Sequence, residues 1–391
     1  MVADSDGYNP QVALRIRHPI ISIDWSPNGR QIAYTSFETG KPTVWIHDLS
    51  TGKRRQVAAF RGNNSAPAFS PDGGTLAVAL SKDGGTKIYL LDTNGQNLRQ
   101  FTTGGSIDTE PAFSPDGKYI YFTSDRGGNP QIYRKPVAGG SAERISFGNA
   151  YAISPAVSPK NDQVAYIVRT GGHFKLVQQD LATGNVIPLS EIGKNESRTE
   201  ALVPDSRVPV ETFANPHGVP LLSKRTKKMI SSRFAICAAA AAVALSLSAC
   251  STVDLDKDKA GSITDGTSVE EALSSKTGPL ANREVHFDFD SYTVSPDQMP
   301  VVTNHAQFLA AHKNLNVRLE GNTDERGGRE YNLALGQKRA EAVKERMTLL
   351  GVSPQQIETI SYGKEKPKAE GHDEAAYYEN RRVDIHYMLN K

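Results

Sequence analysis

The sequence predicts a multidomain chain: a partial all-β propeller of about four blades, then an α+β domain, joined by a disordered or signal-like segment. Three observations support this prediction. A four-residue turn motif recurs every 44 residues in the first half, and an apolar run with a basic start lies within 229–250. From residue 284 onwards, strand-like and helix-like patterns alternate.

The repeated motif is a Ser-Pro turn, which occurs at 26–29, 70–73, 114–117 and 158–161. Proline fixes φ, and the glycine that ends three of the copies accepts a positive φ, so each copy can end one strand and begin the next. The 44-residue period is that of a four-stranded propeller blade. We therefore predict a partial propeller over 1–196. Because blades are stabilised mainly by their neighbours, a fragment of a ring is expected to be only marginally stable.

One stretch of the repeats identifies a family. Residues 109–134 contain Thr-Glu-Pro-Ala-Phe-Ser-Pro-Asp-Gly and then Thr-Ser-Asp-Arg-Gly-Gly-Asn-Pro-Gln-Ile-Tyr-Arg. This stretch resembles the TolB family, the periplasmic six-bladed propellers of the Tol-Pal envelope system, and the resemblance implies a docking surface for proteins. Residues 197–228 lack the blade pattern and are predicted to be an irregular linker. A peptidase would need a Gly-x-Ser-x-Gly nucleophile elbow, which the sequence lacks, so we predict no enzymatic activity.

Residues 229–250 have the order of a secretory signal. Lys227, Lys228 and Arg233 surround its start, and the following apolar run is too short for an ordinary membrane span. The end, Leu-Ser-Ala-Cys, resembles the lipobox of bacterial lipoproteins, which implies a covalent lipid on Cys250 and no other cofactor. The alternative is a buried Ala-rich helix, but it leaves the lipobox and the basic flank unexplained.

The polar stretch 251–283 is predicted to be a flexible tether. Three alternating aspartates from Asp254 suggest a calcium loop, but Lys259 stands where such a loop needs glycine. Ser251 follows the lipobox cysteine where enterobacterial-type sorting uses Asp for inner-membrane retention. This resemblance implies delivery to the outer membrane.

Charge and cysteine usage exclude several classes of partner. The chain has 45 basic and 43 acidic residues, and no basic stretch interleaves with aromatics, so we predict no nucleic-acid partner. Both cysteines, Cys237 and Cys250, lie in the signal-like segment, and no disulfide is expected. The nine histidines are scattered without ligand spacing, so no metal site is predicted.

The C-terminal domain, 284–391, is predicted to have the order β-α-β-α-β-(helix)-β. Ser295 and Pro296 suggest the N-cap and first residue of one helix, and Gly351 suggests the end of the next. Residues 285–292 are predicted to be a strand that leads into a loop, and further strands are predicted at 316–320, 358–362 and 382–388. The two main helices are predicted at 295–312 and 330–349.

The motifs of this domain resemble the OmpA-like peptidoglycan-binding domains. They are Gly-Asn-Thr-Asp at 321–324, the Tyr-Asn, Leu and Arg-Ala positions within 331–340, and Asn-Arg-Arg-Val at 380–383. Phe-Asp-Phe-Asp-Ser-Tyr at 287–292 and Ser-Tyr-Gly at 361–363 narrow the resemblance to the Pal lipoproteins, signal and tether included. One departure is Asn322, where the family commonly has His.

The resemblance implies binding of diaminopimelate in the peptidoglycan stem peptide. Asp324 matches the family's acid for the ligand ammonium, and Arg339 its base for the carboxylate, which a guanidinium can grip with two hydrogen bonds. Without the surrounding motif, such an Asp and Arg would be interpreted as a solvated pair. Arg382 matches a second basic position of the family near the site, whereas Arg381 is interpreted as a structural or surface residue. The lesser contacts implied are Thr323, Asn332, Asp290, Ser291 and Tyr292.

Together the resemblances imply an outer-membrane lipoprotein on the periplasmic face that anchors the membrane to peptidoglycan and supports envelope integrity and division. TolB and other Tol-Pal components would be its partners, and the two halves of the chain could dock on each other. Two alternatives remain open. The chain could be a fusion of adjacent reading frames, with only the part from residue 229 made as a working protein. Alternatively, the propeller is an interaction module kept in the cytoplasm or at the inner membrane, since no export signal begins at Met1.

Overall fold

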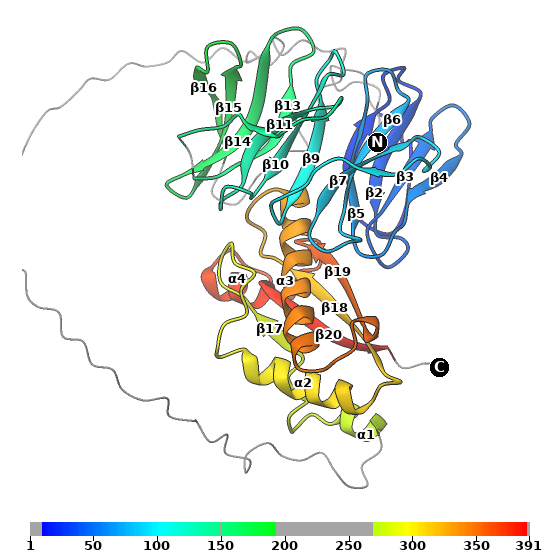
Figure 1. Ribbon diagram of the computed structural model, residues 1–391, viewed down its shortest axis with the longest axis vertical. Helices are drawn as coiled ribbons and strands as arrows, with labels where there is room; N and C mark the ends of the chain where they lie inside the picture. The colour runs from blue at the N-terminus through cyan, green and yellow to red at the C-terminus, as the bar shows by residue number, and fades with distance from the viewer. Residues whose placement is uncertain (1–9, 149, 193–268, 389–391) are drawn as a thin grey trace, which may run out of the picture. The chain divides into compact units, whose positions relative to one another are not determined.

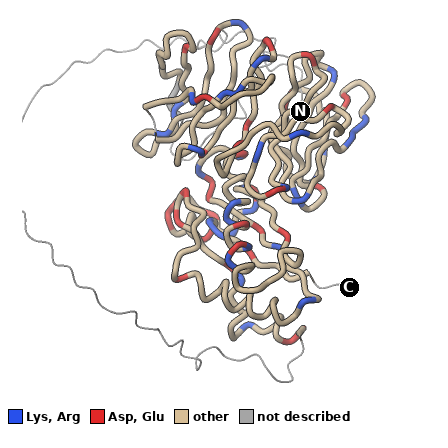
Figure 2. The backbone as a smooth tube through the Cα atoms, in the orientation of Figure 1, with Lys and Arg blue, Asp and Glu red and all other residues tan. Residues whose placement is uncertain are grey.

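The computed structural model describes residues 10–148, 150–192 and 269–388. The predictions made for the linker 197–228, for the signal 229–250 with Cys250, and for the tether as far as residue 268 lie outside these ranges. Within them, no helix is both long and apolar enough to cross a membrane. Basic and acidic residues are interspersed along the chain (Figure 2).

The N-terminal part consists of four antiparallel sheets of four strands each, as predicted for about four blades (Figure 1). The first two sheets are β1 Ile20–Trp25, β2 Gln31–Ser36, β3 Thr43–Asp48, β4 Arg54–Ala58, and β5 Asn64–Phe69, β6 Thr75–Leu80, β7 Lys87–Asp92, β8 Arg99–Gln100. The other two are β9 Asp108–Phe113, β10 Tyr119–Ser124, β11 Gln131–Pro136, β12 Glu143–Arg144, and β13 Ala152–Val157, β14 Gln163–Thr170, β15 His173–Asp180, β16 Val186–Ile192.

The repeated Ser-Pro turn joins the first and second strands of each blade. In the second blade the Ser70 hydroxyl donates to Asp72 at 2.5 Å and accepts the backbone N–H of Thr75 at 2.9 Å. Gly73 takes a φ of 72°, which glycine adopts without strain. The third blade repeats these contacts from Ser114. The motif is therefore a hydrogen-bonded turn that fixes the register of two strands.

The first strand of every blade carries a bulge at the same place. Ser22, Ala66, Glu110 and Ser154, spaced by 44 residues, all have φ between 49° and 58°, and strand pairing is irregular beside each of them. A positive φ is costly for these residue types, so each bulge is maintained by the sheet around it. The repeat thus includes a backbone feature that its turn motif does not reveal.

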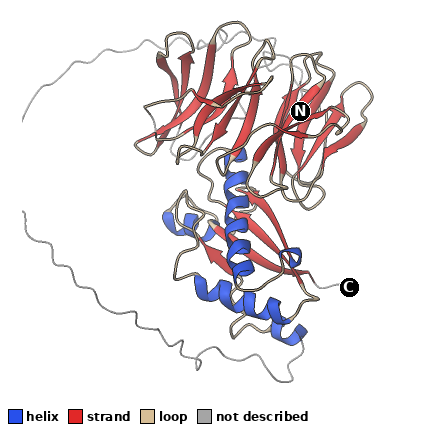
Figure 3. Ribbon diagram, viewed as in Figure 1, coloured by secondary structure: helices blue, strands red, loops and turns tan. Residues whose placement is uncertain are grey.

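The C-terminal part is a four-stranded sheet with an apolar core between one of its faces and the helices Val269–Ser274, Met299–Ala311 and Arg329–Leu349 (Figure 3). The sheet order is β17-β20-β18-β19, with β18 and β19 parallel and the other pairs antiparallel. Its elements are α1 Val269–Ser274, β17 Glu284–His286, α2 Met299–Ala311, β18 Asn316–Asn322, α3 Arg329–Leu349, a 3₁₀ turn Pro354–Gln356, β19 Ile357–Gly363, α4 Glu374–Asn380 and β20 Arg382–Met388.

Two boundaries differ from the sequence prediction. Helix α2 begins at Met299, not at Ser295, and its early proline is Pro300. The predicted tether ended at residue 283, but α1 and the residues after it already belong to the domain, because Leu273 and Leu280 are buried in its apolar core. Two leucines in a polar stretch are a weak signal, and the sequence prediction passed over them.

Helix α3 contacts strand β18 through two glycines. A Cβ on Gly321 would lie 1.8 Å from the carbonyl oxygen of Gly336, and a Cβ on Gly336 would lie 2.3 Å from the Ser361 hydroxyl. No side chain can be accommodated at such distances, so the helix and strand pack backbone against backbone. This approach sets the position of every α3 side chain relative to the sheet.

Glu110 is a buried carboxylate without a bonded cation among the described residues. Its oxygens accept hydrogen bonds from the Thr123 hydroxyl, from the Ser154 N–H at 2.8 Å and from the Ser154 hydroxyl at 2.7 Å. Burial, and then the negative charge of Glu330 on α3, raise the pKa of Glu110 to about 7. The neutral acid is therefore the form that this site favours.

We expect Gly321→Ala to destabilise the C-terminal domain by about 3 kcal/mol or more, because the new methyl group collides with backbone that cannot rotate away. The measurement is urea unfolding followed by the helical circular-dichroism signal. Gly351→Ala is the matched control. Unlike Gly321, Gly351 has a positive φ, 97°, but a Cβ there would enter open space, so the backbone strain alone should cost about 1 kcal/mol. Equal losses for the two variants would contradict the proposed backbone contact.

We expect Glu110→Gln to remove a pH dependence from propeller stability. In the wild type, burying the charged Glu110 carboxylate lowers the free energy of unfolding. This loss is absent below a pH of about 4.5, where Glu110 is protonated in both the folded and the unfolded protein, and it is complete above a pH of about 7. As the pH rises through this window, the free energy of unfolding of the variant should therefore increase by about 3 kcal/mol relative to that of the wild type. Trp25 and Trp45, the only two tryptophans, both lie in the propeller, so their fluorescence reports its unfolding.

The control for this experiment is Asp116→Asn. The hydrogen bond from Ser114 and others in its turn lower the pKa of Asp116 to about 2, so its charge does not change in the same pH window. The stability difference between this variant and wild type should stay constant with pH. A difference for Glu110→Gln that is equally constant would show that Glu110 titrates normally.

Candidate binding site

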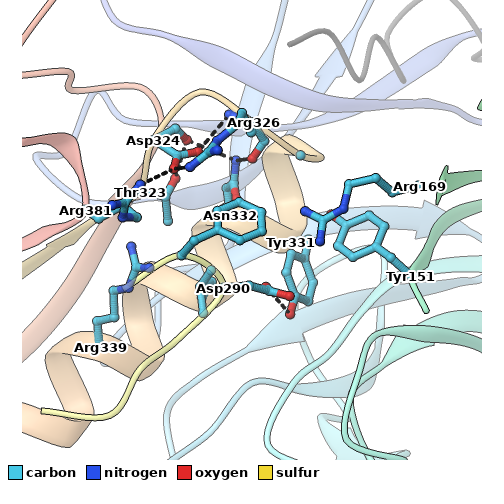
Figure 4. A pocket seen from close by; sticks show the side chains of 13 residues that line it. Tyr151, Arg169, Asp290, Thr323, Asp324, Arg326, Tyr331, Asn332, Arg339 and Arg381 are labelled. Atoms are coloured by element: carbon cyan, nitrogen blue, oxygen red, sulfur yellow. Dashed lines mark hydrogen bonds and ion pairs between the residues drawn. The ribbon is translucent and has the colours of Figure 1, made fainter. Parts of the chain in front are cut away.

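Asp324 lines a small cavity where β18 passes into the loop before α3 (Figure 4). Its carboxylate accepts the backbone N–H of Arg326 at 3.0 Å and contacts two guanidinium groups, those of Arg326 at 2.6 Å and Arg381 at 3.2 Å. The glycines of the loop allow the backbone to fold back on this carboxylate. Asp324 is therefore a buried anion fixed by its own loop and by the residue that precedes β20.

Arg339 approaches the same cavity from α3, one turn after Gly336. It is 1% exposed, and it donates to three backbone carbonyls: Ser291 at 2.8 Å, Asn322 at 2.9 Å and Asp288 at 3.0 Å. Burial lowers its pKa to about 10, while the charge of Asp324 acts in the opposite direction. A guanidinium has five N–H groups, so two remain beyond these bonds to described residues. Arg339 is positioned by the fold and keeps donors for a ligand.

Asp290 and Tyr331 form another side of the cavity. The Tyr331 hydroxyl donates to Asp290 at 3.3 Å, and Asp290 has a φ of 52° in the loop after β17. Burial raises the pKa of Asp290, and the nearby positive charge of Arg169 opposes that shift. The cavity thus contains two carboxylates in different environments, one paired with arginines and one that desolvation partly disfavours.

The other residues predicted for the site fall into two groups. Thr323 and Asn332 line the cavity, and Asn332 donates to the backbone carbonyl of Arg326 at 2.9 Å, which closes the loop. Ser291 contributes only its carbonyl, to Arg339, and Tyr292 points outward at 37% exposed. Arg382 lies elsewhere: its guanidinium bonds Asp384 at 2.9 Å, away from the residues that line the cavity.

Two basic residues of the cavity were missed in the sequence. Arg381, assigned to fold or surface, lines the cavity and bonds Asp324, the carbonyl of Phe287 and Glu374. The Arg326 guanidinium lies between two rings, 4.2 Å from the centre of Phe289 and 4.1 Å from that of Tyr377. The adjacent basic pair at 381–382 was the one sequence feature that could have indicated Arg381 as a cavity residue. Because side chains alternate along a strand, only one of the pair can face the cavity.

Two propeller side chains also line the cavity. The Arg169 guanidinium lies 4.6 Å from the centre of the Phe289 ring, and Tyr151 packs edge-on against Tyr331 with ring centres 5.8 Å apart. With both in place the cavity has a volume of about 20 Å³, which suffices for roughly one water molecule. The end of an amino-acid side chain with an ammonium and a carboxylate does not fit.

Further contacts between the propeller and the C-terminal domain surround this point. Arg61 donates to the carbonyl of Ile357 at 2.7 Å, and Asn63 accepts the backbone N–H of Ser361 at 3.0 Å. The Ser22 hydroxyl at the first bulge donates to Glu330 at 2.8 Å. An apolar cluster also crosses the boundary, with Tyr331 and Leu335 among its members. The first turns of α3 are therefore in contact with the bulged strands of the blades.

Comparison with protein families assigns both parts of the chain. Residues 1–218 match the TolB beta propeller domain, and residues 286–381 match the OmpA family. The propeller segment is 65% identical over 65 residues to the Tol-Pal system protein TolB of Bordetella pertussis, a match that covers 17% of this chain and only 15% of that protein. The chain thus contains a small part of its TolB relative.

The C-terminal part is 47% identical over 118 residues to a peptidoglycan-associated lipoprotein of Pseudomonas putida, which covers 30% of this chain and 70% of that protein. The crystal structure of the peptidoglycan-associated lipoprotein from Burkholderia pseudomallei is 53% identical and covers 30% of this chain and 98% of its own, with a TM-score of 0.29. The chain therefore belongs to the TolB β-propeller domain family over residues 1–218, and to the peptidoglycan-associated lipoproteins of the OmpA family over its C-terminal domain.

Proposed function

We propose that the C-terminal domain binds the diaminopimelate side chain of peptidoglycan in the cavity around Asp324 and, through a lipid on Cys250, anchors the outer membrane to the cell wall. The observation that carries this proposal is the fixed pairing of Asp324 with arginines from two directions. A ligand with one ammonium and one carboxylate needs an acid and a base at set positions, and a rigid site loses little entropy on binding it.

Each charge of the ligand has a partner in this proposal. The ligand ammonium approaches Asp324, whose negative charge is at present shared by Arg326 and Arg381. The ligand carboxylate takes the remaining N–H groups of Arg339 in place of water. No bond of the ligand is broken, so the function is binding without a chemical reaction. Anchorage of this kind supports envelope integrity and constriction at division.

In the full chain, the propeller competes with peptidoglycan for this cavity. Arg169 and Tyr151 leave room for roughly one water there, so a ligand enters only when the propeller moves away. A propeller joined by the same chain is present at high effective concentration, which favours the closed arrangement. The alternative, a propeller acting alone as a protein-interaction module, is favoured by the same contacts, since they supply its docking surface.

We expect Asp324→Asn to lower the affinity of the protein for diaminopimelate-type peptidoglycan about 10-fold or more, because a charge-assisted bond to the ammonium is lost. Binding is measured by co-sedimentation with purified cell-wall sacculi. Arg382→Gln is the matched control, since Arg382 lies outside the cavity, and it should bind as wild type does. Undiminished binding by Asp324→Asn would overturn the assignment of this cavity.

We also expect Arg61→Glu to increase the fraction of full-length protein that sediments with sacculi. Arg61 is exposed on the propeller and bonds backbone carbonyls of the C-terminal domain, so a carboxylate in its place would repel them. Lys53→Glu makes the same charge change at an exposed position without such a contact and should have no effect. If both variants bind like wild type, the propeller does not compete with peptidoglycan.

A further inference from the structure

The C-terminal sheet has a second face, opposite its apolar core, where among the described residues only α4 approaches, beside β17. Along β20, Val383 and Ile385 point into the apolar core, so Asp384 and His386 point to the opposite side. In the antiparallel pairing with β18, Asp384 lies directly opposite Glu320. Strand pairing thus brings together side chains that are about sixty residues apart in sequence, and spacing along the chain gave no sign of this group.

The group has the dimensions of a metal site. The Glu320 carboxylate oxygen lies 3.4 Å from the His386 ring nitrogen Nε2, and one donor atom each from Glu320, Asp384 and His386 can be chosen so that all lie within 4.8 Å of one another. Ligands bonded to zinc at about 2.0–2.2 Å in a tetrahedron are separated by about 3.4 Å. Two carboxylates and one imidazole form an oxygen- and nitrogen-rich set that suits a divalent transition metal.

The group brings two carboxylates together, each of which already contacts one cation of the chain. The side chains of Glu320 and Asp384 are 8% and 13% exposed, and like charges placed opposite each other on neighbouring strands repel. Lys366 contacts Glu320 at 2.8 Å and Arg382 contacts Asp384 at 2.9 Å. Lys366 is 47% exposed, so its ammonium can move into water when a metal ion enters.

Asn322 supplies an independent sign of a ligand. It is fully buried, and its amide nitrogen lies 3.1 Å from Asp384 and 2.9 Å from the carbonyl of Glu320, so the amide points at the group. Its amide oxygen has no hydrogen-bond partner among the described residues. The amide nitrogen donates both of these hydrogen bonds, so the oxygen now points away from the group. Rotation of the amide by half a turn would give up the two bonds and bring the oxygen to the position 3.1 Å from Asp384, a separation typical of two ligands on one cation.

A second cluster on the same sheet, Glu284, His286 and Glu379, shows the contrasting case. Here the Lys368 ammonium contacts both carboxylates, at 2.5 Å and 2.7 Å, and so occupies the cation position itself. The His286 ring is stacked on Tyr378 with centres 4.7 Å apart. In this cluster one ammonium bridges both carboxylates, so it provides a control of matched chemistry.

We propose that Glu320, Asp384 and His386 bind a divalent transition-metal ion of the zinc type, with Asn322 as an adjacent oxygen donor. The metal would join the end of β18 to β20 on the sheet face opposite the apolar core, close in sequence to the loop that carries Asp324. It would replace Lys366 as the partner of Glu320. The proposal departs from the sequence prediction of no metal site, which rested on spacing along the chain.

The test uses the full chain with Cys237→Ser and Cys250→Ser in every sample, so that the two thiols bind no metal. Zn²⁺ alone is titrated by calorimetry at neutral pH. We expect one ion per chain, and an affinity reduced at least about 100-fold in His386→Ala and in Glu320→Gln. His286→Ala should bind normally, and Lys366→Met should bind more tightly, because a competing cation is gone.

Cobalt spectroscopy gives a second readout of the same site. Co²⁺ in a tetrahedral site absorbs strongly in the visible range, and this absorption should appear in the parent protein with both cysteines replaced and vanish in His386→Ala. The circular-dichroism spectra of the variants verify that they are folded. The proposal is overturned if neither the parent protein with both cysteines replaced nor its Lys366→Met variant takes up stoichiometric zinc. It is also overturned if His386→Ala binds zinc as well as the parent protein does. Loss of zinc in His286→Ala but not in His386→Ala would place the metal at the other cluster and also overturn it.

Discussion

The contact between helix α3 and strand β18 is the constraint on which the C-terminal domain depends. Two glycines let the backbones meet, and the next turn of the helix then places Arg339 beneath the end of β18. The beginning of the same helix reaches the bulged strands of the propeller. One close approach therefore fixes the binding cavity and the surface that can cover it. A bulkier residue at Gly321 would displace both, whatever happened to the charged residues themselves.

The cavity shows how a buried arginine can serve both structure and binding. Arg339 exchanges its water for three backbone carbonyls, so its orientation does not depend on a ligand being present. Asp324 is held in the same way by arginines on either side. The arrangement is rigid as it stands, and it is sensitive to any change that leaves one of these charges without its partner.

The sequence predicted the blade period, the order of elements in the C-terminal domain and the lining residues Asp324, Arg339, Thr323 and Asn332, since these follow from repeats, apolar spacing and motifs. It did not distinguish Arg381 from Arg382, because that choice depends on which side of a strand faces the cavity. Nor did it predict the four bulges, which depend on pairing between strands. The start of α2 was misplaced because Ser-Pro pairs also begin turns that precede a helix.

The order of strands in the C-terminal sheet has a consequence for how the chain folds as it is made. Strand β20, the last to emerge from the ribosome, lies between β17 and β18 and pairs with both. The earlier strands have no complete sheet to join until it arrives. Each propeller blade, by contrast, pairs only strands that are neighbours in sequence. During synthesis the blades can therefore form one after another, whereas the binding domain must wait for nearly the whole of its sequence.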